Sequence, residues 1–573
     1  MTNPGGHSFR SRAWLESGDL YGWTRKAALL GMGFDSAAVH DGPIIGICNT
    51  FSELVHCNSH LRTLAEAVKR GVRFAGGLPL EFPVMSLGEF NMLPTTMLYR
   101  NLASMDAEES IRANPLDGVV LLSGCDKTTP ALLRGAASAD VPALLLTGGP
   151  QLSVHWRGEV LGSCTDCRRY QTELRAGNIS PDDWHDLQTH MVRGPGHCMT
   201  MGTASTMAVL AEAMGMSPPG SATVPAVDAR RLRLAEAAGR QIVELARNDV
   251  RPSHILTRAA FTNAIRTLHA IGGSTNAVIH LIAIAGRLGI DLPLPVFDEL
   301  SDSTPLLLNL KPSGAYLMED FEYAGGAPAL LAELAPLLDT SCTTVSGKSL
   351  GENLAGARTH NREVIRSLNA PLRPDGGLCV LYGSLAPRGA IIKRSAASPD
   401  LLRHRGRAIV FDGHDDLVAR IDDPALDVRP HDVLVLRGAG PLGAPGMPEW
   451  GVLPIPKKLL KAGVRDMVRI SDARISGTAA GTVVVHVSPE SAAGGPLAAV
   501  QTGDTIELDV AARKLELLVP PEEIERRLAA RANDPPQRTS PADRRGYRWL
   551  VAQHMLQADQ GCDFDFLRAD FGG

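Results

Sequence analysis

The stretch from Asp117 to Gly149 reads DGVVLLSGCDKTTPALLRGAASADVPALLLTGG, and it decides the fold. Two short apolar runs rich in Val and Leu flank a segment with helical patterning, which is typical of a parallel sheet covered on both faces. Cys125, Asp126 and Lys127 follow the first run directly. Open α/β sheets bind their ligands at the carboxyl ends of the strands. The stretch therefore predicts both the fold class and the position of a site.

The segments before this stretch extend the same pattern. Residues 42–53, GPIIGICNTFSE, predict a buried strand that runs into a loop. Residues 61–77, LRTLAEAVKRGVRFAGG, predict an amphipathic helix that Gly71 should end, with a strand after it. Residues 1–35 predict a polar arm with a short helix, and residues 200–300 are dominated by helical patterning.

The character of the chain changes near residue 370. From GGLCVLYGSLAP onward the segments are short and β-rich, with frequent Gly and Pro, and a charged helical tail closes the chain. This pattern predicts a second, mainly β domain that forms a barrel. The expected fold class is α/β, with an N-terminal domain (1–370) whose parallel sheet is flanked by helices and a C-terminal β-barrel domain (371–573).

Bulk properties exclude several classes of protein. A chain of 573 residues should form more than one domain. A net charge of −5 without a basic run argues against nucleic acid as a partner. No apolar run has the length of a membrane span, and the first residues lack the apolar stretch of a signal peptide. We therefore expect a cytoplasmic protein with neither a membrane nor a nucleic-acid partner.

Three cysteines lie in polar, glycine-marked surroundings far apart in the chain: Cys57 in HCNSH, Cys125 in SGCDKTTP and Cys198 in GPGHCMTMGTASTM. Thiolates are the ligands of iron–sulfur clusters, and three of them leave one iron position open, as a Lewis acid requires. The alternative is that they are buried thiols that act as small hydrophobic residues. Cys48 and Cys379, in apolar runs, fit that alternative better than the three candidates do.

Cys164 and Cys167 form a CxxC pair in GSCTDCRRY. Zinc would need a second pair, which is not apparent, so we expect no functional role for these two residues. Nine cysteines, an odd number spread over a long chain, do not indicate a disulfide framework.

Isolated acidic residues stand in loops rich in Gly, Pro and apolar residues. Asp126 precedes Lys127, Glu89 ends EFPVMSLGE, and Glu449 lies in GAGPLGAPGMPEWG. Such carboxylates suit a hard cation such as Mg²⁺. For each of these residues taken alone, the alternative is that its carboxylate caps a helix or lies in an exposed turn. GAGPLGAPG and IGGSTN could also cradle a phosphate, but neither is a P-loop or a GxGxxG motif.

Ser476 lies in RISDARISGTAAGTVVVHV, between a polar turn and a strand. The spacing is not that of the GxSxG nucleophile elbow, so hydrolase chemistry is poorly supported. The alternative for Ser476 is a turn hydroxyl that caps the backbone.

Five motifs together resemble one family: SGCDKTTP, GHCMTMGTASTM, GGSTNAVIHL, GAGPLGAPGMPEWG and SDARISGTAAGT. They are similar to those of the dihydroxy-acid dehydratase and 6-phosphogluconate dehydratase family, over nearly the whole chain. The resemblance implies an α/β domain that carries an iron–sulfur cluster, a β-barrel domain that closes over it, and a homodimer or homotetramer. The implied reaction removes water from a 2,3-dihydroxy acid and releases a 2-keto-3-deoxy acid.

The resemblance also implies a role for each candidate residue. The cluster would be held by Cys57, Cys125 and Cys198; Mg²⁺ would be held by Glu89, Asp126, Glu449 and a carbamylated Lys127; and Ser476 would be the base. Lewis-acid iron would help the C3 hydroxyl to leave, while Mg²⁺ would stabilise the charge formed when C2 loses its proton.

The substrate branch is implied by EFPVMSLGE, where branched-chain members of the family have an aspartate-rich loop. This loop looks like that of the sugar-acid branch, which acts on aldonates such as L-arabinonate and D-xylonate with a [2Fe–2S] cluster. Three thiolates would equally fit the [4Fe–4S] cluster of 6-phosphogluconate dehydratases. Two alternatives remain: a dihydroxy-acid dehydratase of branched-chain amino-acid biosynthesis, and a non-catalytic iron–sulfur protein.

Overall fold

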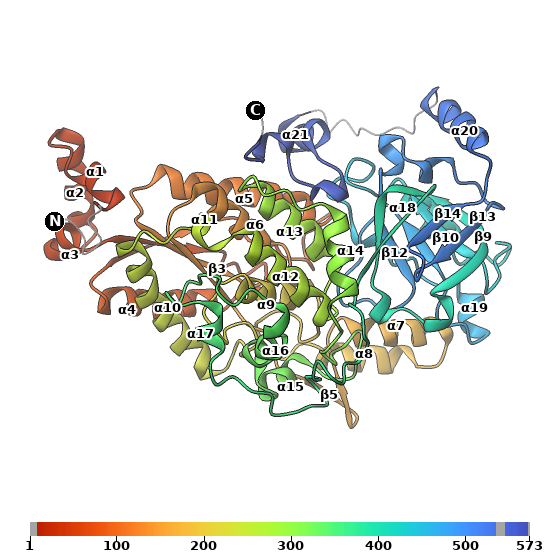
Figure 1. The fold of residues 1–573 in the computed structure, drawn as a ribbon, viewed down its shortest axis with the longest axis horizontal. Coiled ribbons are helices and arrows are strands. Elements are labelled where there is room, and N and C mark those ends of the chain that lie inside the picture. Colours follow the sequence, from red (N-terminus) through yellow and green to blue (C-terminus); the bar gives the residue numbers. More distant parts are fainter. Residues whose placement is uncertain (1–7, 534–544, 571–573) are drawn as a thin grey trace.

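The structure is a computed structural model that describes residues 8–533 and 545–570, without the side chains of residues 532 and 533. An α/β half and a β-barrel half lie side by side (Figure 1). Both parts of the predicted fold class are confirmed. The barrel strands begin at Cys379, while the exact boundary near residue 370 stays a prediction.

A parallel sheet with the strand order β2-β1-β3-β4 forms the centre of the α/β half. Strand β1 pairs in parallel with both β2 and β3, and β3 pairs in parallel with β4. Every residue of β1, β3 and β4 is buried, which explains why these strands are continuous apolar runs. The strands are β1 (Ile44–Asn49), β2 (Leu78–Pro83), β3 (Gly118–Ser123) and β4 (Ala143–Thr147).

Helices cover both faces of this sheet (Figure 1). In Figure 1, α4 packs on α10 below the sheet, and α5 packs on α6 above it. The chain moves in one direction across the sheet from β1 to β2, and in the opposite direction from β2 to β3 and on to β4. Right-handed crossovers therefore place α4 on one face and α5 and α6 on the other. These helices are α4 (Leu61–Phe74), α5 (Thr96–Ala113), α6 (Thr128–Ala139) and α10 (Ala229–Arg247).

Gly71 lies inside α4, so the prediction that it ends this helix was wrong. A Cβ atom at Gly71 would lie 1.9 Å from the carbonyl oxygen of Glu236 in α10. Glycine is therefore needed for the close approach of two helices rather than for a helix end.

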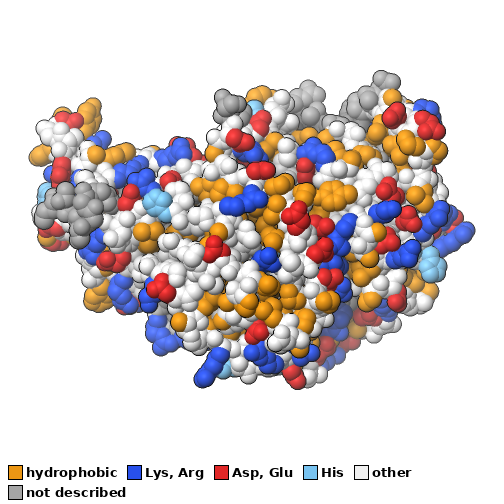
Figure 2. All heavy atoms as spheres, in the orientation of Figure 1, with side chains coloured by type: hydrophobic (Ala, Val, Ile, Leu, Met, Phe, Trp, Pro, Cys, Tyr) orange, Lys and Arg blue, Asp and Glu red, His pale blue; other side chains and the backbone are white. Residues whose placement is uncertain are grey.

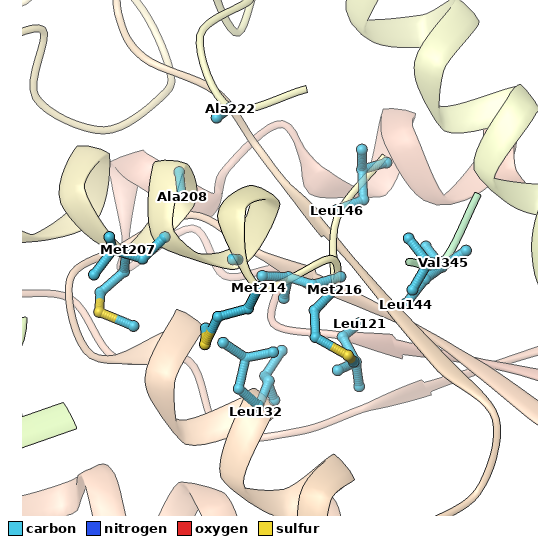
Figure 3. Packing of buried hydrophobic residues seen from close by; sticks show 14 of the residues in the cluster. Leu121, Leu132, Leu144, Leu146, Met207, Ala208, Met214, Met216, Ala222 and Val345 are labelled. Carbon is cyan, nitrogen blue, oxygen red and sulfur yellow. The ribbon is translucent and has the colours of Figure 1, made fainter. Parts of the chain in front are cut away.

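The core beside β3 and β4 shows how the helices are held against the sheet (Figure 3). Leu132 of α6 and Met207 of α9 pack there with strand residues, and the backbone N–H of Leu145 donates to the carbonyl of Met216. Burying each large apolar side chain stabilises the fold by about 1.5–3 kcal/mol. The packed side chains labelled in Figure 3 are those of Leu121, Leu132, Leu144, Leu146, Met207, Ala208, Met214, Met216, Ala222 and Val345.

The N-terminal arm contains more than the single short helix predicted for it. Gly18 has a φ of 73°, and the side chain of Asp19 then accepts a hydrogen bond from the N–H of Gly22, which starts a second helix. Residues 1–7 lie outside the described residues. The arm helices are α1 (Arg10–Leu15), α2 (Leu20–Gly31) and α3 (Ser36–Asp41).

The α/β half also contains a hairpin and further helices, joined by loops that form isolated β-bridges. The helices predicted for residues 200–300 are present. The hairpin consists of β5 (Val154–Trp156) and β6 (Glu159–Leu161). The helices are α7 (Thr165–Ala176), α8 (Pro181–His190), α9 (Thr203–Ala213), α11 (Pro252–Ile255), α12 (Arg258–Ala270), α13 (Asn276–Gly286), α14 (Leu294–Asp302), α15 (Met318–Tyr323), α16 (Gly326–Leu334) and α17 (Leu350–Leu354).

The second half is a closed barrel with the strand order β10-β11-β12-β8-β7-β14-β13-β9. Buried aliphatic side chains such as Leu381, Val435 and Leu508 fill one cluster within it. Closure leaves no open sheet edge. The strands are β7 (Cys379–Gly383), β8 (Ala386–Ile392), β9 (Arg403–Asp412), β10 (Val433–Arg437), β11 (Arg469–Ser471), β12 (Val483–Ser488), β13 (Thr505–Asp509) and β14 (Lys514–Leu517), and the helices of this half are α18 (Gly413–Arg420), α19 (Lys457–Lys461), α20 (Pro521–Asn533) and α21 (Gly546–His554).

The C-terminal tail returns to the α/β half, where α21 lies above α5 and α13 (Figure 1). The buried carboxylate of Asp563 binds Arg134 of α6 and accepts from Nε of Arg287 at 2.8 Å. Burial would raise the pKa of Asp563, but the charges of Arg134 and Arg287 outweigh it and lower the pKa to about 2. The tail thus fastens the end of the chain to the N-terminal half.

Within residues 8–533 and 545–570, no helix combines the length and the apolar character needed to cross a bilayer.

Candidate active site

The predicted site residues of the α/β half lie in loops that follow the strands of the sheet. Cys57 follows β1, Glu89 follows β2, and Cys125 follows β3 directly before α6. Cys198 is brought beside the end of β4 because His197 forms a β-bridge with Pro150. The carboxyl edge of the sheet therefore collects these loops, a position that the sequence predicted for Cys125 and its neighbours Asp126 and Lys127.

The cysteine thiols form two contacting pairs. Cys57 packs against Cys125, and their hydrogen bond together with burial raises the pKa of Cys57. The Sγ atoms of Cys198 and Cys164 lie 3.1 Å apart, and this contact raises the pKa of Cys198, as burial also does. All of these thiols are free.

The two residues of the CxxC pair lie in different surroundings. Cys167 packs in the apolar cluster of Trp156 and Tyr170, as a structural cysteine would. Cys164 instead contacts a predicted cluster ligand, which the sequence did not indicate because Cys198 is in a different loop.

The polar residues around Cys57 hold the loops together. The side chain of Asn58 donates to the hydroxyl of Ser86 at 2.8 Å, and Nε2 of His60 lies 2.8 Å from the carbonyl oxygen of Gly148. The HCNSH motif thus joins the loops after β1, β2 and β4 around the thiols.

A second group of residues surrounds the fully buried ammonium of Lys127. Its Nζ lies 3.6 Å from Oε2 of Glu89, 3.5 Å from Oδ2 of Asp126 and 3.8 Å from Oε1 of Glu449. Glu449 comes from the barrel half, where it begins a 3-10 turn (Glu449–Gly451). The structure therefore brings together the four residues that were predicted to bind Mg²⁺.

The charges in this group perturb one another. Burial would raise the pKa of Glu89, but Lys127 and Arg474 outweigh it and lower the pKa to about 2. Burial raises the pKa of Asp126 to about 6, with a further contribution from the negative charges of Glu89 and Glu449. Such crowding of carboxylates favours a bound cation.

Arg474 completes the group and was missed in the sequence, although it lies in the SDARISGT motif. Its fully buried guanidinium donates to Oε1 of Glu449 at 2.5 Å, to Oε1 of Glu89 at 3.3 Å and to the hydroxyl of Thr95 at 2.5 Å. Arg474 therefore positions carboxylates from both halves of the molecule.

The donor sets fit the two predicted groups by their chemistry, since thiols suit iron–sulfur clusters and carboxylates suit Mg²⁺. Across the described ranges, no three His, Cys, Asp or Glu side chains stand close enough together to hold a metal ion without adjustment. The ammonium of Lys127 separates the carboxylates, so a metal there would require Lys127 to lose its charge or to move.

The Ser476 loop runs between β11 and β12 and is held from both sides. The hydroxyls of Ser476 and Thr478 lie 2.9 Å apart. Asn276, from the GGSTN motif, donates to the carbonyl of Ile475 at 3.0 Å, and the hydroxyl of Thr165 donates to the carbonyl of Thr478 at 3.0 Å. The α/β half therefore fixes a loop of the barrel.

Lys393 is a further buried group beside this loop. Its Nζ donates to the carbonyl of Gly477 at 3.4 Å, and burial lowers its pKa to about 7. No pattern in its surroundings, AIIKRSAAS, marks it in the sequence.

The GAGPLGAPG loop cradles carboxylates of the protein itself. The N–H of Ala439 donates to Asp472 at 3.0 Å, and the N–H groups of Leu442 and Gly443 each donate to Glu490 at 2.8 Å. These donors are therefore already used, which argues against the phosphate-binding alternative for this loop.

A cavity of about 730 Å³ lies between α7 and the barrel, beside the Ser476 loop. Thr165 and Thr478 form part of its wall, which carries basic residues such as Arg168 and acidic residues such as Asp166, the ion-pair partner of Lys311.

Comparisons with known proteins agree with this architecture. The family model described as Dihydroxy-acid/6-phosphogluconate dehydratase N-terminal matches residues 42–353, and its C-terminal counterpart matches residues 363–562. These ranges correspond to the α/β half and to the barrel half.

Similar proteins align over almost their whole lengths. An L-arabonate dehydratase of Azospirillum brasilense is 53% identical over 97% of this chain and 96% of its own. An L-arabinonate dehydratase of Rhizobium leguminosarum bv. trifolii is 50% identical over 97% and 96%, and a 6-deoxy-6-sulfo-D-gluconate dehydratase of Pseudomonas putida is 49% identical over 98% and 96%. The chain therefore belongs to the dihydroxy-acid/6-phosphogluconate dehydratase family.

Proposed function

We propose that the protein is a hydro-lyase that converts a linear sugar acid, such as the pentonates L-arabinonate or D-xylonate, into its 2-keto-3-deoxy acid. One observation carries this proposal: about half of the residues, over nearly the full length of the chain, are identical to those of dehydratases named for sugar acids. The loop EFPVMSLGE gives independent support from the sequence.

Ser476 is proposed to take the proton from C2 of the substrate. The electron pair left at C2 forms the C2–C3 double bond as the C3–O bond breaks. The proton taken by Ser476 is then passed to the departing hydroxide, which leaves as water, and the enol tautomerises to the ketone. The hydroxyl of Thr478, 2.9 Å away, can donate to the oxygen of Ser476 and stabilise its negative charge before proton transfer. When bound, an iron–sulfur cluster supplies a Lewis acid for the leaving hydroxyl and Mg²⁺ stabilises negative charge on the substrate.

The role of Ser476 is tested by replacing it. Ser476→Ala should keep its metals and lose about 10²–10⁴-fold in kcat, as expected when a proton-transfer group is removed. Ser384→Ala, which removes an exposed hydroxyl on the barrel, is the matched control and should keep normal kcat. A metal-replete Ser476→Ala enzyme with near-normal turnover would exclude Ser476 as the base.

Cys57, Cys125 and Cys198 are the proposed ligands of a [2Fe–2S] cluster, which is supported by their convergence at the sheet edge. Serine at any of the three should remove the brown colour and the bound iron. Cys342→Ser, at a cysteine whose sulfur contacts the side chain of Asn263 in α12, should leave both unchanged. Iron and sulfide analysis with electron paramagnetic resonance of the reduced protein gives the cluster type. Full iron content in Cys57→Ser would contradict this ligand set.

Glu89, Asp126, Glu449 and Lys127 are the proposed ligands of Mg²⁺, with Lys127 carbamylated. Reaction of the neutral amine with CO₂ releases a proton and converts a cation into an anionic oxygen ligand, which removes the charge that separates the carboxylates. The carbamate is tested by ¹³C NMR after incubation with ¹³C-bicarbonate and Mg²⁺. We expect a carbamate signal in the native protein and none in Lys127→Met. Absence of the signal from the native protein would refute the carbamylation of Lys127.

The substrate class is tested by comparing kcat/KM for L-arabinonate, D-xylonate, D-gluconate and 2,3-dihydroxyisovalerate on one preparation. A site that hydrogen-bonds the outer hydroxyls of a sugar acid leaves polar groups unpaired when an apolar acid binds, so sugar acids should be strongly preferred. Preference for 2,3-dihydroxyisovalerate would favour the branched-chain alternative. No activity on any of them with an intact cluster would favour a non-catalytic protein.

A homodimer or homotetramer is proposed as the functional assembly. The projecting arm carries exposed hydrophobic side chains (Figure 2). In α2 they include those of Leu20, Tyr21 and Trp23, each about 70% exposed. An exposed apolar patch of this kind suits a protein interface. Light scattering after size exclusion should give an oligomer that a Tyr21→Ser/Trp23→Ser variant weakens; a monomeric native protein would refute the proposal.

A further inference from the structure

Cys164 and Cys198 come from different loops, yet their sulfur atoms lie 3.1 Å apart. A disulfide bond requires about 2.05 Å, so the two sulfur atoms need to approach by about 1 Å. Both residues lie outside the helices and strands, Cys164 directly before α7 and Cys198 shortly before α9.

The backbone holds Cys164 in an unusual conformation. Its φ of 67° and ψ of −48° lie in a region that residues with a Cβ rarely adopt. Neighbouring bonds maintain it, because the hydroxyl of Thr165 donates to the carbonyl of Thr478 and the N–H of Arg168 donates to the carbonyl of Cys164 at 3.3 Å. Strained residues persist where their surroundings over-determine them, often at functional sites.

Cys164 is the accessible member of the pair. The residues Cys164 and Cys198 are both partly exposed, but the thiol group of Cys198 is buried, and Cys57 and Cys125 are buried as whole residues. Thr165, the next residue after Cys164, lines the cavity of about 730 Å³ between α7 and the barrel. A peroxide in this cavity would therefore be one residue along the chain from Cys164.

We propose that Cys164 and Cys198 form a redox-active pair that closes into a disulfide when a peroxide reaches the cluster-free chain, and that the closed pair cannot take up a cluster. One sulfur attacks the peroxide, the O–O bond breaks, and a sulfenic acid and one water result from hydrogen peroxide. The sulfur of the second thiol then attacks the sulfenic sulfur, the S–S bond forms, and a second water leaves. Two thiols are oxidised by two electrons, and the peroxide is reduced to two waters.

The consequence for the cluster rests on the proposed function, in which Cys198 is a ligand. A sulfur atom in a disulfide is no longer a thiolate and cannot bind iron. The closed pair would also protect Cys198 from irreversible oxidation, because disulfides are restored by thiol reductants and sulfonic acids are not. By forming this disulfide, Cys164 would keep Cys198 in a form that thiol reductants can return to a free thiol while the cluster is absent.

The experiment uses the full chain, freed of iron by a chelator, reduced, and treated with hydrogen peroxide. The native protein should lose two of its nine thiols, and peptide mass spectrometry should find Cys164 linked to Cys198. Cys164→Ser should lose this link, while Cys167→Ser, the matched control three residues away, should keep it. Absence of the link in the native protein, or a link between Cys164 and Cys167 in its place, would overturn the proposal.

Iron uptake separately tests the claim that the disulfide blocks cluster assembly. After peroxide and its removal, the native chain should lose most of its iron and sulfide uptake, as followed by absorbance, and dithiothreitol should restore it. Normal uptake by protein shown to be cross-linked would overturn the claim that the disulfide blocks assembly. If the fully reduced native chain takes up no iron, the proposed cluster fails, whereas the disulfide is still judged by its peptide mass.

Discussion

Asn276 donates from its side-chain amide to the carbonyl oxygen of Ile475 at 3.0 Å, across 199 positions of sequence. The first residue of α13 in the α/β half thereby holds the barrel loop that carries Ser476. The same amide also donates to the hydroxyl of Thr203 at 3.1 Å, so the loop is fixed relative to α9 as well. The proposed base is thus positioned by the opposite half of the molecule.

Replacing Asn276 should therefore reduce turnover without removing metal. Asn276→Ala leaves the carbonyl of Ile475 without this donor, and a shift of the loop by about 1 Å can cost about 10²-fold in rate. Steady-state kinetics with iron and magnesium analysis measure the effect. Asn248→Ala, at the exposed end of α10, is the control and should behave like the native enzyme; unchanged kcat in Asn276→Ala would show that the bond does not position the base.

Arg474 should control the affinity for Mg²⁺. Arg474→Lys keeps the positive charge but loses the fork that joins Glu449, Glu89 and Thr95, so the carboxylates lose their alignment. Loss of such outer partners typically weakens metal binding by about 10–100-fold, which calorimetric titration with Mg²⁺ can measure. Arg465→Lys, at a partly exposed arginine that pairs with Glu173, should leave the Kd unchanged. Equal affinities in all three proteins would contradict the role of Arg474.

Lys393 should make the free energy of unfolding depend on pH between about 7 and 10.5. Its folded pKa of about 7 lies below the ordinary value of 10.5, so between these values the unfolded chain binds a proton that the folded chain does not. The free energy of unfolding therefore rises with pH in this window, by up to about 1.4 kcal/mol per pH unit. At pH 7 and below, the folded protein carries the cost of a buried charge.

Lys393→Met removes this contribution, so the variant should be more stable than the native protein near pH 7, with the difference shrinking toward pH 10. Thermal unfolding of both proteins across this range measures it. Lys348→Met, at an exposed lysine, should show a constant difference from the native protein. A constant difference for Lys393→Met as well would mean that Lys393 is not buried as a neutral amine.

Asp563 should anchor the C-terminal tail. Asp563→Asn leaves Arg134 and Arg287 buried beside a neutral group, and breaking a buried ion pair costs about 3–5 kcal/mol. Asp570→Asn removes an exposed partner of Arg568 and should change stability by less than about 0.5 kcal/mol. Denaturant unfolding measures the free energy of unfolding of both variants. Similar losses in the two would mean that the anchoring of the tail contributes little to stability.

Much of the α/β half could be predicted from the sequence because its signals are local. The apolar run before Cys125 forms β3 and the helical pattern after Lys127 forms α6, as expected. Cys125, Asp126 and Lys127 could be assigned to the carboxyl edge because they follow a strand of a parallel sheet directly. Gly71 shows the limit of local reasoning, since its role depends on Glu236 in another helix.

The residues missed in the sequence share one property, which is that their partners are distant in the chain. Arg474 reaches Glu89 across 385 positions, and Asn276 and Lys393 act on a barrel loop from other elements. Periodicity along one segment carries no information about which loops of two domains will meet.

The sequence by itself determined the fold class, most of the strands and helices, the family and the chemical types of the candidate ligands, because these depend on local pattern and motif. Only the tertiary structure decided that Arg474 joins Glu89 to Glu449, and that Cys164 contacts Cys198 while Cys167 does not. Those contacts arise from packing between the sheet edge, α7 and the barrel. Packing depends on side chains from many segments at once, and therefore no single stretch of sequence specifies it.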